Sequence, residues 1–166
     1  MQPSPEAERV IAALVAQGRT VAVAESLTGG QLIAELIDVP GASAAVRGGI
    51  VAYATDLKAD LLGVSESLLA EHGPVHPEVA RRMAIGARHA CGRDGQLADL
   101  GIATTGVAGP EPQGDAAVGT VFLGISSERG ERSIELHLAG DRQQIRRQTV
   151  SAALTAMIAE LDSPRE

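Results

Sequence analysis

Residues 20–30 have the sequence TVAVAESLTGG, in which a run of small and β-branched residues leads directly into a turn with paired glycines. The run from Thr20 to Ala24 predicts a short strand, because β-branched side chains fit a pleated surface. Apolar residues at helical spacing between Leu32 and Ile37 predict a helix after the turn. The stretch is therefore interpreted as a strand that turns into a helix.

Similar patterns continue on both sides of this unit. Ser4 and Pro5 predict the start of a first helix, which Gly18 ends. Further strands are predicted at residues 49–54, 99–103, 118–125 and 133–138, and further helices at residues 55–63, 65–72, 77–91 and 141–161. Because strands and helices alternate first and a hairpin follows, we expect an α/β fold with three layers, α/β/α, around a mixed sheet. Residues 1–166 are predicted to form one such domain.

The composition excludes several classes of protein. The formal net charge is −7 and aromatic residues make up 1%, so the chain lacks the basic face and the stacking side chains of a nucleic-acid binder. Cys91 is the only cysteine, which rules out an internal disulfide, and we recognise neither a signal peptide nor a membrane-spanning stretch. These features predict a cytoplasmic protein without a nucleic-acid or membrane partner.

Lys58 is the only lysine among 14 basic residues, and all the others are arginines. Only a lysine amine can lose its proton and act as a base near neutral pH, because a guanidinium stays protonated. Taken alone, a single lysine is more simply explained by chance. Its neighbourhood favours a functional role, because the only tyrosine, Tyr53, lies five residues upstream.

Three loops follow predicted strands, and ligands of open α/β sheets collect at the carboxyl ends of strands. The first loop contains Ser26, Thr28, Gly29 and Gly30. Its backbone N–H groups suit an anion or a developing oxyanion. Taken alone, Ser26 or Thr28 is more simply explained as a helix cap.

The second region runs from Gly41 to Lys58 and contains Ser43 and Tyr53. If Thr55 caps the next helix, Lys58 lies in its first turn, where the helix dipole and burial both favour the neutral amine. A neutral lysine near a serine can activate the hydroxyl in place of a histidine. Taken singly, Tyr53 is also explained as a packed strand residue and Ser43 as an ordinary loop serine.

The third loop offers Thr105 as a hydrogen-bond donor and Gly106 and Gly109 for close approach, with a plain glycine-rich connection as the alternative. Arg142 and Arg146 share a face near the start of the last helix. They could hold a phosphate, although a solvated basic face is the simpler interpretation. With one cysteine and scattered histidines, no metal site is predicted.

These motifs, taken together and in order, resemble the CinA C-terminal domain family over about residues 7–161. The matching segments are AESLTGG at 24–30, GGIVAY at 48–53, Lys58 with LGV at 62–64, HGPV at 72–75, TGVAGP at 105–110, VGTV at 118–121, and GDR at 140–142 with RRQ at 146–148. Active members of that family are nicotinamide-nucleotide amidohydrolases, or NMN deamidases. Leu27, Ala42 and Ala54 depart from residues that are frequent in the family.

The resemblance implies hydrolysis of nicotinamide mononucleotide to nicotinate mononucleotide and ammonia, in pyridine nucleotide salvage, without a metal or other cofactor. By the family pattern Ser43 is the nucleophile and Lys58 the base. Ser26 also falls on a family position and stays open as the nucleophile. Otherwise it supports the carboxamide, together with Tyr53 and Thr105.

Binding of the substrate phosphate is assigned to Arg142 by the same resemblance. It also implies a homodimer or a larger homo-oligomer. The alternative function is that of a non-catalytic module that binds a phosphorylated nucleotide as a sensor or scaffold. Only the enzyme requires a neutral Lys58 beside a serine hydroxyl.

Overall fold

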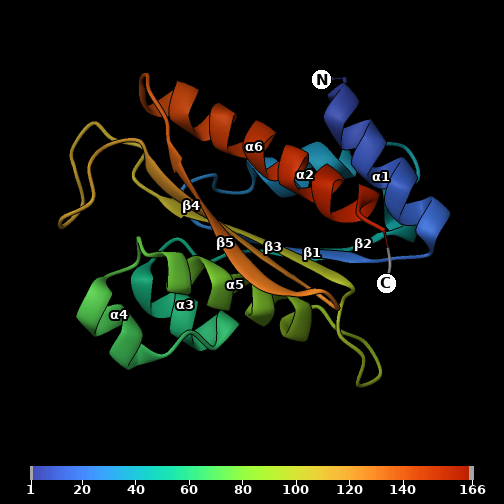
Figure 1. Cartoon of the computed structure of the whole chain (residues 1–166), viewed down its shortest axis with the longest axis horizontal. Coiled ribbons are helices and arrows are strands. Elements are labelled where there is room, and N and C mark those ends of the chain that lie inside the picture. The colour runs from blue at the N-terminus through green and yellow to red at the C-terminus, as the bar shows by residue number, and fades with distance from the viewer. Residues whose placement is uncertain (1, 165–166) are drawn as a thin grey trace.

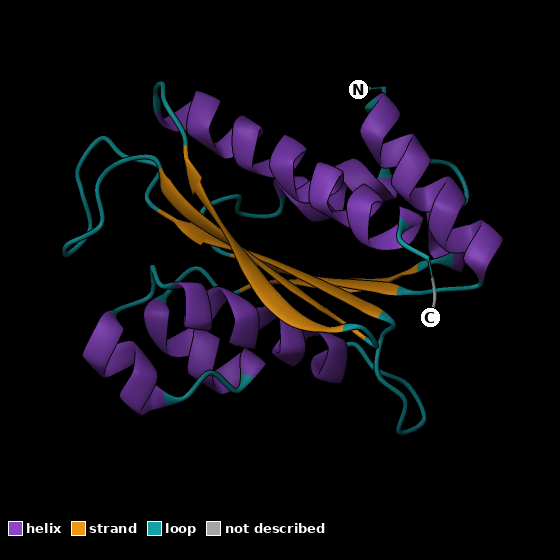
Figure 2. Cartoon of the chain, viewed as in Figure 1, coloured by secondary structure: helices purple, strands orange, loops and turns teal. Residues whose placement is uncertain are grey.

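The computed structural model describes residues 2–164 and shows a twisted sheet between two layers of helices (Figure 1, Figure 2). The predicted three-layer α/β/α fold with a mixed sheet is confirmed. The strands are β1 (Val21–Glu25), β2 (Val46–Val51), β3 (Leu100–Gly106), β4 (Thr120–Ser127) and β5 (Gly130–His137). The helices are α1 (Pro5–Gln17), α2 (Gln31–Ile37), α3 (Thr55–Leu62), α4 (Glu66–His72), α5 (Pro77–Ala90) and α6 (Arg142–Asp162), with a 3-10 helix η1 (Ala42–Ala44).

The sheet has the strand order β2-β1-β3-β4-β5. Strands β2, β1 and β3 are parallel, whereas β4 and β5 run antiparallel as the predicted hairpin. The carboxyl ends of the three parallel strands therefore lie at one edge of the sheet. The loops that follow these strands meet at this edge, as expected for an α/β domain.

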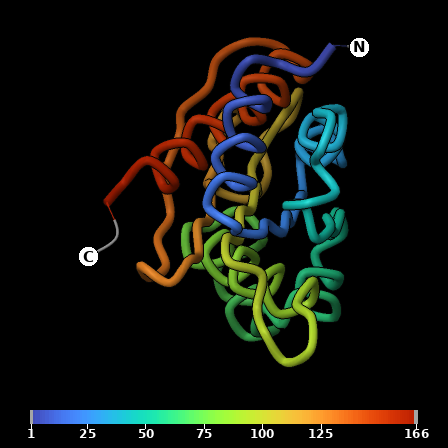
Figure 3. Tube along the Cα trace, turned by 90° about the vertical axis from the view of Figure 1, so that its right-hand side faces the viewer, coloured from blue at the N-terminus to red at the C-terminus, as the bar shows by residue number. Residues whose placement is uncertain are grey.

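Each face of the sheet has its own apolar core. One core joins the sheet to α1, α2 and α6, and the other joins it to α3, α4 and α5. Figure 3 shows the same division from the side, with α1 and α6 in the upper part and residues 55–90, teal to green, in the lower part. The two helical layers therefore cover the two faces of the sheet.

Glycines in the strands let α5 pack directly on the sheet. A Cβ at Gly101 would lie 2.2 Å from Ala84 O, and a Cβ at Gly124 would lie 1.8 Å from Ala80 O. Such distances exclude any side chain at either position, so the helix backbone lies almost on the strand backbones. This close packing places the Gly73–His76 segment before α5 near the sheet edge.

Helices α1 and α6 begin with side-chain caps. The side chain of Ser4 accepts a hydrogen bond at the start of α1, and Asp141 forms a capping box with Gln144 at the start of α6. The predicted cap at Thr55 is wrong, because Ala54 is the N-cap of α3 and makes no side-chain cap bond. No helix among residues 2–164 is long and apolar enough to cross a membrane.

Strand β2 begins earlier than predicted. The pattern at residues 49–54 indicates a strand, but the observed strand covers Val46–Val51. Pairing with β1 explains the difference, since Val21 is opposite Val46 and Glu25 is opposite Val51. Residues 52–54 leave the sheet and bring the chain to α3.

Candidate active site

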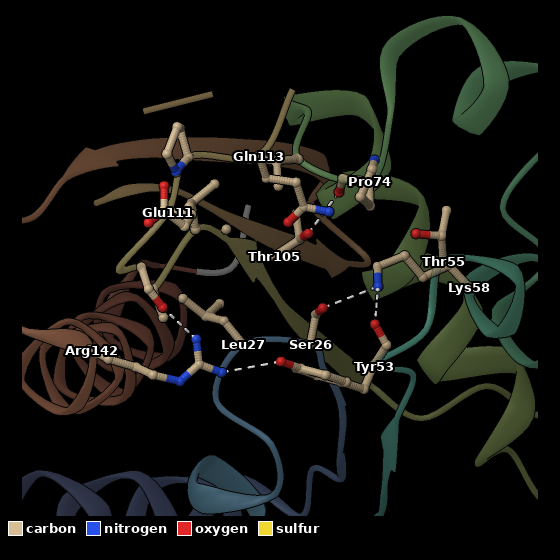
Figure 4. A pocket seen from close by; sticks show the side chains of 16 residues that line it. Ser26, Leu27, Tyr53, Thr55, Lys58, Pro74, Thr105, Glu111, Gln113 and Arg142 are labelled. Carbon is tan, nitrogen blue, oxygen red and sulfur yellow. Dashed lines mark hydrogen bonds between the residues drawn. The ribbon is translucent and has the colours of Figure 1, made fainter. Parts of the chain in front are cut away.

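A pocket opens at the carboxyl edge of the parallel strands, where the three predicted loops meet (Figure 4). Its volume is about 310 Å³. Segments from five parts of the chain form its walls. The lining residues are Ser26, Leu27, Tyr53, Thr55, Lys58, Pro74, Val75, Thr105, Gly106, Val107, Ala108, Gly109, Glu111, Pro112, Gln113 and Arg142.

Lys58 lies at the base of this pocket, and its side chain is the largest fully buried one in the described chain. Its Nζ lies 3.0 Å from Ser26 Oγ, 2.7 Å from the Ala52 carbonyl oxygen and 3.4 Å from the Tyr53 carbonyl oxygen. No carboxylate forms an ion pair with it among residues 2–164. The amine is therefore held only by neutral oxygens.

Burial lowers the pKa of Lys58 from 10.5 to about 8. Desolvation is the cause, because an apolar environment penalises the charged ammonium more than the neutral amine. A substantial fraction of the amine is thus neutral close to physiological pH. This property separates Lys58 from every arginine in the chain.

Ser26 is held rigidly opposite Lys58. It follows directly after β1, and its backbone N–H donates to the Thr104 carbonyl oxygen at 3.0 Å, which extends the pairing of β1 with β3. Only 8% of the residue is exposed. The hydroxyl therefore stands at the pocket floor with the Lys58 amine as its close neighbour (Figure 4).

The predicted pairing of Ser43 with Lys58 within one chain is wrong. Ser43 lies in η1, before the amino end of β2, whereas Lys58 follows the carboxyl end of that strand. A six-residue strand separates its two ends by roughly 20 Å. Ser43 instead lines two other hollows. Thr20 and Asp99, which precede parallel strands, line one of them.

The glycine turn after Ser26 is not a free anion cradle. The buried carboxylate of Glu25 accepts hydrogen bonds from the N–H groups of Gly30, Leu32 and Ile33, at 3.1, 3.1 and 2.8 Å. The chain's own acid thus occupies the amino end of α2, as the helix dipole favours. Accordingly Gly30 does not line the pocket, which contradicts its predicted role in substrate binding.

Thr28 and Gly29 are also directed away from the substrate pocket. Thr28 is fully buried, and its hydroxyl bonds that of Thr104 at 2.8 Å. The Gly29 N–H donates to the Ser26 carbonyl oxygen at 3.1 Å. Both residues shape the turn that carries Ser26, but the predicted contact of Thr28 and Gly29 with substrate is not supported by the pocket.

Arg146 holds the same turn from α6. Its Nε donates to the Leu27 carbonyl oxygen at 2.8 Å, and its Nη2 donates to the Thr28 carbonyl oxygen at 3.1 Å. A Cβ at Gly29 would lie 3.3 Å from this guanidinium, so a side chain there would crowd the contact. Arg146 is therefore a positioning residue for the Ser26 turn rather than part of an exposed basic face.

Arg142 closes one side of the pocket together with Tyr53. Its Nη1 donates to the Gly109 carbonyl oxygen at 2.7 Å, and its Nη2 donates to the Tyr53 hydroxyl at 3.1 Å. These bonds tie α6 to two loops that are far apart in sequence (Figure 4). Both Arg142 and Tyr53 line the pocket, so the structure brings these two predicted site residues together with Lys58.

The third loop lines the pocket where it was expected. Thr105, Gly106 and Gly109 all contribute to the wall. The hydroxyl of Thr105 donates to the Pro74 carbonyl oxygen at 2.7 Å. This bond joins the loop to the segment before α5. The three residues therefore lie at the pocket as predicted, but the Thr105 hydroxyl donates within the protein and not toward a ligand.

Several pocket residues were missed by the sequence reasoning. Glu111 and Gln113 lie in the loop between β3 and β4, and Pro74 and Val75 lie in the turn between α4 and α5. The HGPV motif contains Pro74 and Val75, and Glu111 and Gln113 follow closely after the TGVAGP motif, so these two motifs were the available signal. Within residues 2–164, no three His, Cys, Asp or Glu side chains come together as a metal site would require.

The chain is similar in sequence to known proteins over most of its length. The family model of the CinA C-terminal domain matches residues 4–161. A "CinA-like protein" of Frankia casuarinae is 51% identical over 145 residues, which cover 87% of this chain and 32% of that protein. A "CinA-like protein" of Geobacter metallireducens is 46% identical over 84% of this chain and 32% of its own length. The chain thus spans about a third of these curated relatives.

Solved structures agree over nearly the whole chain. The crystal structure of competence damage-inducible protein A from Klebsiella pneumoniae has a TM-score of 0.90 at 30% identity and covers 96% of this chain and 97% of its own. A competence/damage inducible protein from Agrobacterium tumefaciens has a TM-score of 0.85 at 32% identity, with 98% and 99% covered. The chain therefore belongs to the CinA C-terminal domain family.

Proposed function

We propose that this protein is an amidohydrolase that converts nicotinamide mononucleotide to nicotinate mononucleotide and ammonia. The observation that carries the proposal is the buried Lys58 amine, with a pKa of about 8, lying 3.0 Å from the Ser26 hydroxyl in a pocket. The family supports the choice of substrate. Ser26, and not Ser43, is the proposed nucleophile.

The contacts of Lys58 suit a base. A neutral amine has two N–H bonds and one lone pair, and two carbonyl oxygens, of Ala52 and Tyr53, lie at 2.7 and 3.4 Å. If these carbonyls accept the two hydrogens, the lone pair is left for the Ser26 hydroxyl proton. The backbone thereby orients the amine, as the third member of a catalytic triad orients its base.

The reaction proceeds in two balanced steps. Ser26 Oγ attacks the carboxamide carbon while Lys58 takes the hydroxyl proton, and the resulting ammonium returns a proton to the leaving nitrogen as ammonia departs. Water then attacks the ester that joins Ser26 to the nicotinate mononucleotide acyl group, with Lys58 again as the base, and releases nicotinate mononucleotide and free serine. One water is consumed and one ammonia is released.

The residue after the nucleophile is placed to stabilise the oxyanion. The Leu27 N–H donates to no other group among the described residues, and Leu27 lines the pocket. An N–H at this position is a common oxyanion donor in serine hydrolases. Arg146 supports it by holding the Leu27 carbonyl oxygen at 2.8 Å, which restrains the turn.

The phosphate of the substrate is assigned to Arg142. The guanidinium stays charged and lies at the pocket, where it already bonds Gly109 and Tyr53. Phosphate oxygens are well matched by a guanidinium fork.

Self-association and a cytoplasmic location remain predictions.

A direct assay tests the proposed function. Purified protein with nicotinamide mononucleotide and an excess of chelator is expected to release ammonia and nicotinate mononucleotide in equal amounts. An enzymatic assay measures the ammonia, and chromatography measures the nicotinate mononucleotide. Protein that binds the nucleotide but releases no ammonia over a range of pH and salt would instead support the non-catalytic sensor or scaffold.

The pH dependence of the reaction should reflect Lys58. Since only the neutral amine can accept a proton and its pKa is about 8, the rate is expected to rise about tenfold per pH unit below 8 and to level off above it. A kcat/KM profile of the wild type between mildly acidic and alkaline pH measures this. A rate that is flat through the region near pH 8 would contradict Lys58 as the base.

A further inference from the structure

Glu25 is a fully buried carboxylate that the proposed mechanism does not use. It is the last residue of β1, and it does not line the pocket. Among residues 2–164, no basic side chain forms an ion pair with it. Its two oxygens instead accept three backbone hydrogen bonds from the first residues of α2 and the glycine before them. Burial of a charge is costly, so packing alone does not explain an acid at this position.

The backbone of Glu25 links the proposed nucleophile to the group that orients the base. Ser26 follows Glu25 directly in the chain. The Glu25 carbonyl oxygen accepts the Ala52 N–H at 2.9 Å, and the Ala52 carbonyl oxygen accepts the Lys58 amine at 2.7 Å. The contact between Ser26 and Lys58, drawn as a dashed line in Figure 4, is thus closed through one backbone position.

The side chain of Glu25 ties this position to one helical layer. Its carboxylate bonds α2, which packs in the layer of α1 and α6, whereas the Ser26 hydroxyl bonds Lys58 of α3 in the opposite layer. The turn between Ser26 and α2 contains Gly29 and Gly30 at positive φ, 56° and 95°. Because glycine has a wide conformational range, the turn depends on outside contacts for a single shape.

Arg146 holds the same turn by the opposite polar groups. The guanidinium binds the carbonyl oxygens of Leu27 and Thr28, whereas the carboxylate of Glu25 binds N–H groups. Hydrogen bonds to charged groups are stronger than those between neutral groups, so the two residues restrain the turn from both sides. We propose that Glu25 is a positioning residue that, jointly with Arg146, holds the Ser26 hydroxyl and the Leu27 N–H in their reactive geometry.

This inference rests on the proposed function, and Glu25→Gln tests it. The variant keeps the size of the side chain, but its NH2 group would face a backbone N–H, so at least one of the three hydrogen bonds is lost. We expect kcat for nicotinamide mononucleotide to fall about a hundredfold, the cost of a misplacement of about 1 Å. KM should stay within about twofold, because no residue that lines the pocket is changed.

The pH profile separates an effect on the nucleophile from an effect on the base. The rate of Glu25→Gln should still level off near pH 8, because Lys58 keeps its burial and its pKa of about 8. Only the height of the plateau should fall. A displaced midpoint with an unchanged plateau would overturn the assignment, because Glu25 would then act on the charge of Lys58.

Leu36→Ala is the matched control for lost stability. Leu36 is fully buried near the other end of α2, so its truncation should lower the melting temperature at least as much as Glu25→Gln does. Its kcat should stay within about twofold of the wild type. Equal losses of kcat in Leu36→Ala and Glu25→Gln would overturn the inference, as would an unchanged kcat in Glu25→Gln.

Two further variants keep the test valid if Glu25→Gln does not fold. Glu25→Asp keeps the charge but is one methylene shorter, and kcat should fall about tenfold with KM unchanged. Arg146→Lys replaces a fork by a single contact, and it should show the same pattern. The double variant of Glu25→Asp and Arg146→Lys should lose less than the product of the two single losses, because both residues hold one turn. A loss equal to the product would contradict the joint action.

Labelling of Ser26 separates this inference from the proposed function. Phenylmethanesulfonyl fluoride contains no nicotinamide. Ser26 Oγ forms a bond to its sulfur, fluoride leaves, and the hydroxyl proton passes to Lys58. Peptide mass spectrometry locates the label, and its rate of formation should be about a hundredfold lower in Glu25→Gln than in the wild type.

The labelling rate and ammonia release fail separately. If labelling is slower in Glu25→Gln but the wild type releases no ammonia, the positioning role stands and the proposed hydrolysis fails. If ammonia is released and Glu25→Gln matches the wild type in kcat and labelling rate, the hydrolysis stands and the positioning role fails. A wild type that is neither labelled at Ser26 nor active would contradict both.

Discussion

Replacement of Lys58 by arginine should lower kcat about a thousandfold, the usual contribution of a positioned base. Arginine keeps the positive charge and a similar reach, but its guanidinium cannot accept a proton in the working pH range. Lys58→Ala should be about as inactive as Lys58→Arg. Steady-state kinetics with nicotinamide mononucleotide measure the effect.

The matched control for folding is Lys58→Met, which keeps the length of the side chain and removes the amine. It should also be inactive. A buried amine with a pKa lowered from 10.5 to about 8 costs the folded wild type about 3 kcal/mol of stability below pH 8, and the cost disappears as pH rises toward 10.5. Lys58→Met should lack this rise, because it has no proton to lose.

The sign follows from the two protonation equilibria. Between pH 8 and 10.5 the unfolded chain binds more protons at this position than the folded chain does, so the free energy of unfolding of the wild type increases with pH. Thermal melts of both proteins across this range measure the difference. A well-folded Lys58→Arg protein with near wild-type turnover would end the serine–lysine proposal, and inactivity of Lys58→Met keeps the test valid if arginine prevents folding.

Ser26→Ala should abolish turnover, with a loss of about four orders of magnitude in kcat, while Ser43→Ala should stay within about twofold of the wild type. Each substitution removes one serine hydroxyl, but only the Ser26 hydroxyl lies 3.0 Å from the Lys58 amine. Because Ser26 and Lys58 act as one unit, the double variant with Lys58→Met should lose little more than either single variant.

A second measurement identifies the nucleophile without kinetics. Rapid quenching of the wild type during turnover, followed by peptide mass spectrometry, should show the nicotinate mononucleotide acyl group, with its ribose phosphate, as an ester on the peptide that contains Ser26. An inactive Ser43→Ala variant beside an active Ser26→Ala variant would reverse the assignment. An acyl group on the Ser43 peptide would do the same.

Much of the fold could be predicted from local pattern. Helix caps such as Ser4 and Asp141, and the apolar spacing inside α1 and α6, mark elements that local chemistry determines. The start of β2 was missed because edge-strand register depends on pairing with β1 rather than on its own residues. The absence of a cap at Thr55 likewise reflects how the chain leaves the sheet at residues 52–54.

The sequence by itself determined that the chain is a three-layer α/β domain, that it carries a lysine suited to be a base, and that its motifs are those of the CinA C-terminal domain. It offered two serines as nucleophile, and the family pattern favoured Ser43. Only the tertiary structure shows which serine lies beside Lys58. Strands β1 and β2 run parallel, so the residue after β1 meets Lys58 at the carboxyl edge, whereas Ser43, before β2, lies at the opposite edge.

The same distinction explains the glycine turn. Its N–H groups were expected to bind a substrate anion, but Glu25 folds back and accepts three of the hydrogen bonds around the start of α2. The state of Lys58 also depends on folding, because its pKa falls to about 8 only when the two helical layers and the sheet exclude water from the amine. Burial and proximity arise from contacts between distant segments, and local sequence patterns do not contain them.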